Sequence, residues 1–329
     1  AETNSGMLTL LLSSYGISGL QLLHTKPIRV FHCGPQTRSL LPVRGAATSP
    51  TLDEDAAALL EEARGDVEAA RMAYIQYTMA YIRDEQPDVY EALINEPSRP
   101  DIHEALVEIT WDSIAAFLPV THSPTPTPGA ARRLEAVARA TCGDGAAKVL
   151  DVGCGNGLLL PFLSAAAASP LAYQGIDLSS RMVQAAATMY ARDSASFLCT
   201  SFASVAADGQ EAYDAIIFNG SLQFFADPIG TISQAAALLR SGSCSRIVVS
   251  HISGASFVRS EKAENPATVL SELPSIEALE SAALQLKLRL VPWDGIAWQD
   301  IGIEAATEAL DDFYLAVFAW AEDASSPSV

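Results

Sequence analysis

At residues 149–157 the chain reads Val149-Leu150-Asp151-Val152-Gly153-Cys154-Gly155-Asn156-Gly157, a short apolar run that ends in one acidic residue and three glycines spaced two apart. The apolar run indicates a buried strand, and the leucines at 158–160 predict the opening of a buried helix. Glycine at such a turn permits positive φ and lets the backbone approach a ligand closely. The N-terminus of the following helix would add unpaired N–H groups for a carboxylate or phosphate. The sequence therefore predicts a ligand-binding turn near the middle of the chain.

The composition describes a globular protein with an acidic surface. Of 329 residues, 49% are apolar and 18% are charged, which is typical of a folded chain with a real core. The 39 acidic residues outnumber the 20 basic ones and give a formal net charge of −19. Because no dense run of Lys and Arg is present either, nucleic-acid binding is disfavoured as the main task.

The cysteines predict neither a zinc site nor a disulfide framework. They are odd in number, scattered, and contain no C-x-x-C pair, a pattern that fits a reducing compartment. No metal site is predicted. Cys154 is interpreted as a small residue of the glycine turn and not as a nucleophile. The five positions are Cys33, Cys142, Cys154, Cys199 and Cys244.

Residues 1–50 have the composition of a targeting leader. The stretch 4–50 lacks Asp and Glu, is rich in Ser and Thr, and carries a few basic residues, as organelle transit segments do. The apolar stretch 7–23 is short and polar for a membrane span but acceptable as a signal-type region, so no stable span is expected in the mature chain. This leader would suit import into a plastid through the secretory route, with a mitochondrion or the cytoplasm as the alternative location. The alternative interpretation of the segment itself is a disordered tail without a targeting role.

Two segments follow before the most regular part of the chain. Residues 51–120 show apolar positions at three- and four-residue spacing, with a tyrosine stripe at Tyr74, Tyr77 and Tyr81, and predict a helical segment. Core packing is the favoured interpretation of the tyrosines over a ligand pocket. Residues 121–130 alternate proline with small polar residues and predict a linker, with His122 as a solvated loop residue.

From residue 131 to 325, predicted strands alternate with predicted helices. This alternation indicates a mainly parallel sheet with helices on both faces, an α/β fold of seven strands. The strands are predicted at 148–152, 172–177, 196–199, 213–219, 246–251, 287–291 and 312–320, and the helices at 131–141, 158–167, 228–239 and 275–286, with another that Ser179 or Ser180 would cap; Trp293 and Trp298 fall in an irregular insertion.

Five loops should meet at one edge of this sheet, because parallel strands place their carboxyl ends together and ligands bind there. Besides the glycine turn, these ends carry Asp177, Thr200-Ser201, Asn219-Gly220 and His251. Their convergence predicts a single site built from separate loops.

The G-x-G-x-G turn, with Asp151 before it and Asp177 ending the second strand, resembles the class I S-adenosylmethionine-dependent methyltransferases of the type 11/25-like kind. The section 213–251 and the ending 312–317 are also similar to plant and algal plastid methyltransferase-like proteins. The resemblance implies a Rossmann-like domain over 131–325 below a helical cap, S-adenosyl-L-methionine as cofactor, its methionine part on the turn, and both ribose hydroxyls on Asp177. The implied cofactor-binding residues are Asp151, Gly153, Cys154, Gly155, Asn156, Gly157, Asp177, Leu178, Thr200, Ser201, Phe202, Asn219 and Gly220.

One position departs from the family pattern. Many members carry an acidic residue after the third strand for the adenine amino group, and this chain has Thr200-Ser201 there. A hydroxyl accepts only one such hydrogen bond. A catalytically idle descendant, with a structural or assembly role in an organelle complex, is therefore kept as the alternative to an active enzyme.

Methyl transfer requires alignment of donor and acceptor and, for O–H or N–H acceptors, removal of a proton. His251 is the candidate base, although a loop histidine satisfied by backbone contacts is equally compatible with its position. Asn219 is a candidate for orienting the acceptor, with Gln223, Phe224 and Phe225 as pocket or core residues. Because the fourth strand does not continue as N-P-P-Y, a small-molecule acceptor, or less readily a protein, is expected in place of a nucleic acid.

Overall fold

In a computed structural model of the protein, the structure describes residues 52–121, 125–142, 145–191, 194–209, 212–242, 244–291 and 309–321. The predicted leader, His122 and the predicted insertion with Trp293 and Trp298 lie outside these residues. Within them, no helix is both long and apolar enough to cross a membrane.

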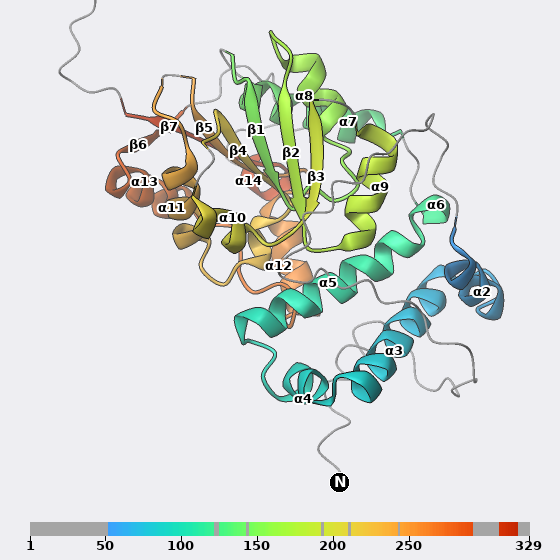
Figure 1. The fold of residues 1–329 in the computed structure, drawn as a ribbon. Coiled ribbons are helices and arrows are strands. Elements are labelled where there is room, and N and C mark those ends of the chain that lie inside the picture. The colour runs from blue at the N-terminus through green and yellow to red at the C-terminus, as the bar shows by residue number, and fades with distance from the viewer. Residues whose placement is uncertain are drawn as a thin grey trace, which may run out of the picture.

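A seven-stranded sheet forms the centre of the molecule, which confirms the predicted fold class (Figure 1). Its strand order is β3-β2-β1-β4-β5-β7-β6, and the first five strands run parallel. β7 is antiparallel to both of its neighbours, β5 and β6. The strands are β1 (Lys148–Val152), β2 (Ala172–Asp177), β3 (Ala195–Cys199), β4 (Ala215–Asn219), β5 (Arg246–His251), β6 (Leu288–Leu290) and β7 (Tyr314–Trp320).

Helices cover both faces of the sheet. One face packs against α7, α8 and α9, and the other against α10, α11 and α13. The helices that follow the N-terminal segment are α7 (Pro128–Cys142), α8 (Leu160–Ala166), α9 (Ser180–Tyr190), α10 (Phe202–Asp208), α11 (Pro228–Leu238), α12 (Gly254–Glu264), α13 (Ile276–Gln285) and α14 (Ala309–Asp312), with the short 3-10 helix η1 (Leu222–Phe224) after β4.

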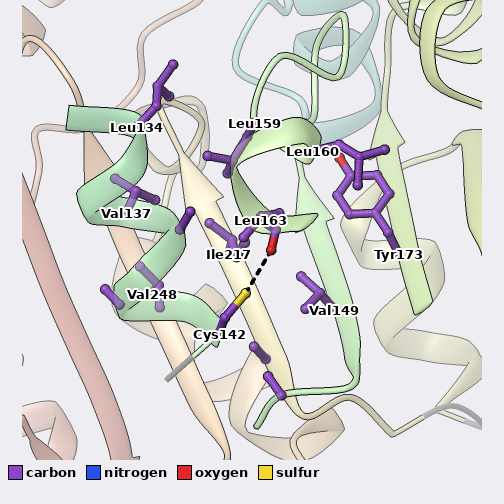
Figure 2. Packing of buried hydrophobic residues seen from close by; sticks show 14 of the residues in the cluster. Leu134, Val137, Cys142, Val149, Leu159, Leu160, Leu163, Tyr173, Ile217 and Val248 are labelled. Carbon is purple, nitrogen blue, oxygen red and sulfur yellow. Dashed lines mark hydrogen bonds between the residues drawn. The ribbon is translucent and has the colours of Figure 1, made fainter. Parts of the chain in front are cut away.

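The core below α7 shows how two helices are fixed on the sheet (Figure 2). Val149, Ile217 and Val248 come from three neighbouring strands and are fully buried against α7 and α8. The Cys142 thiol donates to the carbonyl oxygen of Leu163 at 3.4 Å, and burial raises the pKa of this thiol to about 11. The thiol is therefore protonated and belongs to the packing between these helices.

The N-terminal segment is helical, as predicted, and consists of α2 (Glu54–Glu62), α3 (Val67–Glu85), α4 (Pro87–Asn95), α5 (Pro100–Ala116) and α6 (Leu118–Thr121). Gly65 has φ of +85° and Asp66 accepts hydrogen bonds from the N–H groups of Glu68 and Ala69, so α2 and α3 are separate helices. Tyr74 is 2% exposed and packs in a small core with α2, which supports the packing interpretation of the tyrosine stripe.

Several boundaries differ from the sequence-based expectation. α7 begins at Pro128, inside the predicted linker, because proline is compatible with the first turn of a helix, where its missing N–H is not needed. α8 begins at Leu160 and not at Leu158, since the glycine turn extends through Leu159. The closing strand starts at Tyr314, and the residues before it form α14.

The cysteine prediction was wrong on one count. Cys142, Cys154 and Cys244 are free, whereas Cys199 at the end of β3 is disulfide-bonded. Scattered spacing is not informative on this point, because a disulfide depends on which segments the fold brings together.

Candidate functional site

The glycine turn after β1 is held by backbone hydrogen bonds to β2. Gly153, Gly155 and Gly157 all have positive φ, between +53° and +77°. The N–H groups of Gly153 and Cys154 both donate to the carbonyl oxygen of Ile176, at 2.9 and 3.0 Å. A Cβ on Gly153 would lie 2.5 Å from the Cβ of Ser221, so this position admits only glycine without rearrangement. The turn is thus a pre-formed cradle with its backbone exposed toward the carboxyl edge of the sheet.

Asp177 connects the end of β2 to the glycine turn. Its Oδ2 accepts from the N–H of Gly155 and its Oδ1 from the N–H of Ser179, both at 2.8 Å. Burial and the nearby Asp112 together raise the pKa of Asp177 to about 6. Each carboxylate oxygen retains a second lone pair, so the side chain can still accept hydrogen bonds from a ligand.

Asp151 is the most deeply buried acid of the site, with 2% of its surface exposed. Its Oδ2 accepts from the hydroxyl of Tyr173 at 2.8 Å, and its Oδ1 has no hydrogen-bond partner. Burial raises the pKa of Asp151 to about 7. A buried carboxylate oxygen without a partner is costly, which indicates that a donor on a ligand completes this position.

Side-chain hydrogen bonds connect the end of β4 to the end of β5 and the residues after β4 to β1. Ser250 donates its hydroxyl to Oδ1 of Asn219 at 2.9 Å, and Ser221 donates to the carbonyl oxygen of Val152 at 2.5 Å. Gly220, between the two, has φ of +70°. These contacts fix Asn219 at the rim of the site.

Two residues of α5, which the sequence reasoning missed, complete the site from the N-terminal segment. Glu104 lies beside Ser201, and burial raises the pKa of its carboxyl. His103 is 6% exposed, and its Nε2 lies 2.8 Å from the carbonyl oxygen of Thr268. Figure 1 shows α5 passing along the end of the sheet where β1, β2 and β3 terminate. His103 shares a helix face with Val107 and Trp111, a spacing of four that the sequence does show.

These elements enclose one cavity of about 390 Å³. Of the predicted cofactor-binding residues, it contacts all but Gly157. Its wall is mostly apolar, with polar groups gathered at the strand ends and at the start of α5. The lining residues include Ser98, His103, Glu104, Val107, Trp111, Leu134, Asp151, Gly153, Cys154, Gly155, Asn156, Leu158, Leu159, Asp177, Leu178, Thr200, Ser201, Phe202, Asn219, Gly220, Phe224, Phe225, Ile252 and Leu270.

Two of the predicted positions, Gly157 and Gln223, do not line the cavity. A Cβ on Gly157 would meet Tyr190 at 2.9 Å, so this glycine allows the turn to pack against α9 and does not face the cavity. Gln223 is buried outside the cavity and donates to the carbonyl oxygen of Gly220. Cys154 does line the cavity, but burial raises the pKa of its thiol well above the ordinary value, in keeping with its interpretation as a turn residue.

His251 ends β5 as predicted but does not line the cavity. Its ring stacks on Phe257, with ring centres 5.4 Å apart, and its Nδ1 accepts from the N–H of Ser253 at 3.2 Å. Burial lowers the pKa of His251 to about 4. Because Nδ1 is already an acceptor, the proton of the neutral ring is on Nε2, which leaves no nitrogen free to take a proton. These contacts favour the alternative interpretation of His251, a histidine satisfied by backbone contacts, over the prediction that it is the base.

The described residues contain no group of three or more His, Cys, Asp or Glu side chains that could hold a metal ion.

Comparison with known proteins agrees with the site. Residues 150–244 match the family model described as "Methyltransferase domain", a segment that runs from the glycine turn through β4 and α11. This match confirms the methyltransferase resemblance of the turn and of Asp177. No curated protein shows a significant sequence match to the chain.

Three solved structures are similar at low identity. A chain of the complex between the Haloferax volcanii Trm112 methyltransferase activator and a methyltransferase is 22% identical, with 64% of this chain and 98% of that chain covered and a TM-score of 0.46. The plantazolicin methyltransferase BpumL, in complex with a monoazolic desmethylPZN analog and SAH, is 15% identical over 74% and 97%, with a TM-score of 0.42. An O-methyltransferase family protein from Burkholderia thailandensis is 16% identical over 74% and 71%, with a TM-score of 0.46.

Proposed function

We propose that this chain, which carries a class I S-adenosylmethionine-dependent methyltransferase domain, transfers a methyl group from S-adenosyl-L-methionine to a small-molecule acceptor. The observation that carries the proposal is the single cavity that joins the glycine turn and Asp177 to the N-terminal helix α5. A protein acceptor is less compatible with this cavity, because helix α5 covers the edge of the sheet where the acceptor must enter.

The polar groups of the cavity fit the cofactor at three places. The partnerless Oδ1 of Asp151 can accept a hydrogen bond from the ammonium group of the methionine part, beside the exposed backbone of the glycine turn. Asp177 can accept from two ribose hydroxyls with its remaining lone pairs. Glu104, next to Ser201, supports adenine binding at the place where the third strand lacks the acid of the family pattern.

The cofactor supplies an activated methyl group on a sulfonium, so the protein has little covalent chemistry to perform. Its residues align the acceptor with the methyl–sulfur bond and exclude water from the reaction. The apolar wall of Val107, Trp111 and Phe224 suits both tasks. Asn219, fixed by Ser250, is placed to orient a polar group of the acceptor.

The alternative is an idle methyltransferase fold that serves as a structural or assembly subunit of an organelle complex. It was suggested by Thr200-Ser201, and the position of Glu104 weakens that argument. The plastid location stays a prediction.

Calorimetric titration with S-adenosylmethionine separates the two functions. We expect the wild type to bind with micromolar affinity and Asp177→Ala to lose most of this binding, because both the ribose contacts and the support of Gly155 are removed. A thermal melt of Asp177→Ala checks that the fold is retained. If the wild type does not bind the cofactor, the enzyme proposal is wrong and the idle fold is supported.

A further inference from the structure

We propose that His103 of α5 is the general base of this methyltransferase, and that the acceptor is a neutral, flat aromatic molecule that presents a hydroxyl group to it. This inference rests on the proposed function and deepens it. It concerns the half of the cavity opposite the glycine turn, which belongs to the N-terminal segment.

The hydrogen bond to Thr268 fixes which nitrogen of His103 is basic. Only an N–H can donate to a carbonyl oxygen, so Nε2, 2.8 Å from the Thr268 oxygen, carries the proton of the neutral ring. Among the described residues, no other group hydrogen-bonds to the His103 ring, so Nδ1 keeps a free lone pair. Burial lowers the pKa of His103, and the ring is therefore neutral at physiological pH. This arrangement, one nitrogen oriented by a fixed partner and the other free, is what a general base requires.

The hydrogen bond that orients the His103 ring joins two distant parts of the chain. Thr268 is 6% exposed and lies in the loop after α12, where its N–H donates to the carbonyl oxygen of Asn265 at 3.2 Å. This hydrogen bond therefore connects α5 to the loop after α12. His251 differs from His103, because its Nδ1 already accepts a hydrogen bond from the backbone N–H of Ser253.

The neighbours of His103 define the shape of the acceptor. Val107 and Trp111 follow at intervals of four on α5, and Trp111 makes an edge-to-face contact with Phe224, with ring centres 5.9 Å apart. These side chains form an apolar aromatic wall, which favours a flat aromatic molecule.

The charges of the cavity define the polarity of the acceptor. The acidic side chains that line the same cavity as His103 are those of Glu104, Asp151 and Asp177. An acceptor with a permanent carboxylate or phosphate would be repelled by them, so the acceptor enters neutral and loses its proton only during transfer. A hydroxyl on an aromatic ring is acidic enough for a neutral imidazole to accept its proton as transfer proceeds.

The hydroxyl oxygen forms a bond to the methyl carbon while the methyl–sulfur bond breaks, and the electron pair of that bond remains on sulfur. The hydroxyl proton moves to Nδ1 of His103, which becomes an imidazolium and releases the proton to water after the product leaves. No oxidant, reductant or metal is needed.

Nitrogen-15 NMR of the full chain tests the contact without turnover. The protein is saturated with S-adenosylhomocysteine and then titrated with 2-naphthol, with naphthalene as the probe that lacks the hydroxyl. We expect the Nδ1 resonance of His103 to shift with 2-naphthol and to move far less with naphthalene, whereas the His251 resonances stay unchanged. Equal responses to the two probes, or a response at His251 alone, would overturn the assignment.

Two substitutions test the proton transfer with labelled S-adenosylmethionine and 2-naphthol. His103→Gln keeps a donor for the Thr268 oxygen and an acceptor for the hydroxyl but is not basic, so we expect methylation to fall by about 10²- to 10⁴-fold while 2-naphthol binding changes only a few-fold. His251→Asn, which keeps an acceptor for the N–H of Ser253, is the matched control and should retain the wild-type rate.

The outcomes separate this inference from the proposed function. If the wild type fails to bind S-adenosylhomocysteine, the proposed function fails and His103 has no such role. If it binds, but His103→Gln methylates 2-naphthol as fast as the wild type or the wild type methylates no hydroxylated aromatic probe, only the present inference is overturned.

Discussion

The hydroxyl of Ser179 donates to Oδ1 of Asp112 at 2.5 Å and joins the N-terminal segment to the cofactor side of the domain. Ser179 is also the N-cap of α9, since its Oγ accepts from the N–H of Met182 at 3.0 Å. Both residues are buried. One serine, two residues after Asp177, thus caps a helix of the methyltransferase domain and holds α5 over the sheet edge.

Ser179→Ala should therefore destabilise the protein by about 2 kcal/mol, because a cap is lost and a buried carboxylate loses a donor. Ser275, the N-cap of α13, provides the matched control: its Oγ accepts from the N–H of Ala278 and it is exposed. We expect Ser275→Ala to cost about 1 kcal/mol or less. Urea unfolding of both variants measures the difference, and equal costs would contradict a role for Ser179 in joining the two parts.

The glycine turn allows a second matched comparison. Gly153 and Gly155 both have positive φ, but only at Gly153 would a Cβ collide, 2.5 Å from Ser221; at Gly155 there is nothing within 4 Å. Gly155→Ala should cost about 1–2 kcal/mol for the left-handed backbone alone. Gly153→Ala should cost a further 1–3 kcal/mol, about the cost of overpacking. Urea unfolding measures the free energy of unfolding of both variants. Equal stability of Gly153→Ala and Gly155→Ala would show that the turn rearranges to accept the Cβ at Gly153.

Much of the fold was predictable, because parallel strands buried on both faces are continuous apolar runs separated by helical patterns. The seven strands and the carboxyl-edge site follow from that alternation. The place of β7 between β5 and β6 was not predictable, since its neighbours are chosen by long-range pairing and not by local sequence. The boundaries of α8 and β7 also depended on local turns that apolar patterns do not mark.

The site residues at the strand ends were predictable from the sequence. The site residues that the N-terminal helix α5 contributes were not. Asp151 and Asp177 were located because the strand that precedes each of them fixes its position. His251 was located correctly at the end of β5, but the strand end does not determine where its ring lies, and the ring stacks on Phe257 of α12. His103 and Glu104 were missed because helix periodicity indicates a buried face without showing what that face covers.

Cofactor affinity should depend on pH through the buried acids. Burial raises the pKa of Asp151 to about 7 and of Asp177 to about 6, both from 3.8. The folded, cofactor-free state therefore holds protons that the unfolded chain has released, and the stability contributed by these groups falls as pH rises from about 4 to 7. A cationic ammonium favours the ionised carboxylates, so affinity for S-adenosylhomocysteine should rise over the interval from about pH 5.5 to 7.5, with proton release.

Calorimetry in two buffers of different ionisation enthalpy measures both the affinity and the released protons. We expect Asp151→Asn to bind more weakly and to show a flatter pH dependence, because the amide does not titrate. Glu280→Gln, which removes one negative charge from the exposed face of α13, serves as the control for net charge. An unchanged pH dependence in Asp151→Asn would mean that Asp151 does not meet the cofactor ammonium.

Glu104 and Glu108 lie one turn apart on α5 and should differ sharply in their effect on the cofactor. Glu104 lines the cavity beside Ser201, whereas Glu108 does not line it, and burial raises the pKa of Glu108 to about 8. Because Glu108 is protonated at neutral pH, Glu108→Gln replaces it with a group of nearly the same shape and charge, and binding of S-adenosylhomocysteine should change little. Glu104→Gln removes a charged acceptor for the adenine amino group and should weaken binding about tenfold, the effect of a lost charged hydrogen bond of about 1.5 kcal/mol.

An analogue with a 6-oxo group in place of the adenine amino group shows whether Glu104 acts at that group. The wild type and Glu108→Gln should prefer S-adenosylhomocysteine over this analogue, S-inosylhomocysteine, in parallel titrations. Glu104→Gln should lose most of that preference, because the glutamine amide can pair with either group whereas the carboxylate only accepts. If Glu104→Gln discriminates as well as the wild type, the adenine lies elsewhere in the cavity and the hydroxyls of Thr200 and Ser201 bind it without help from α5.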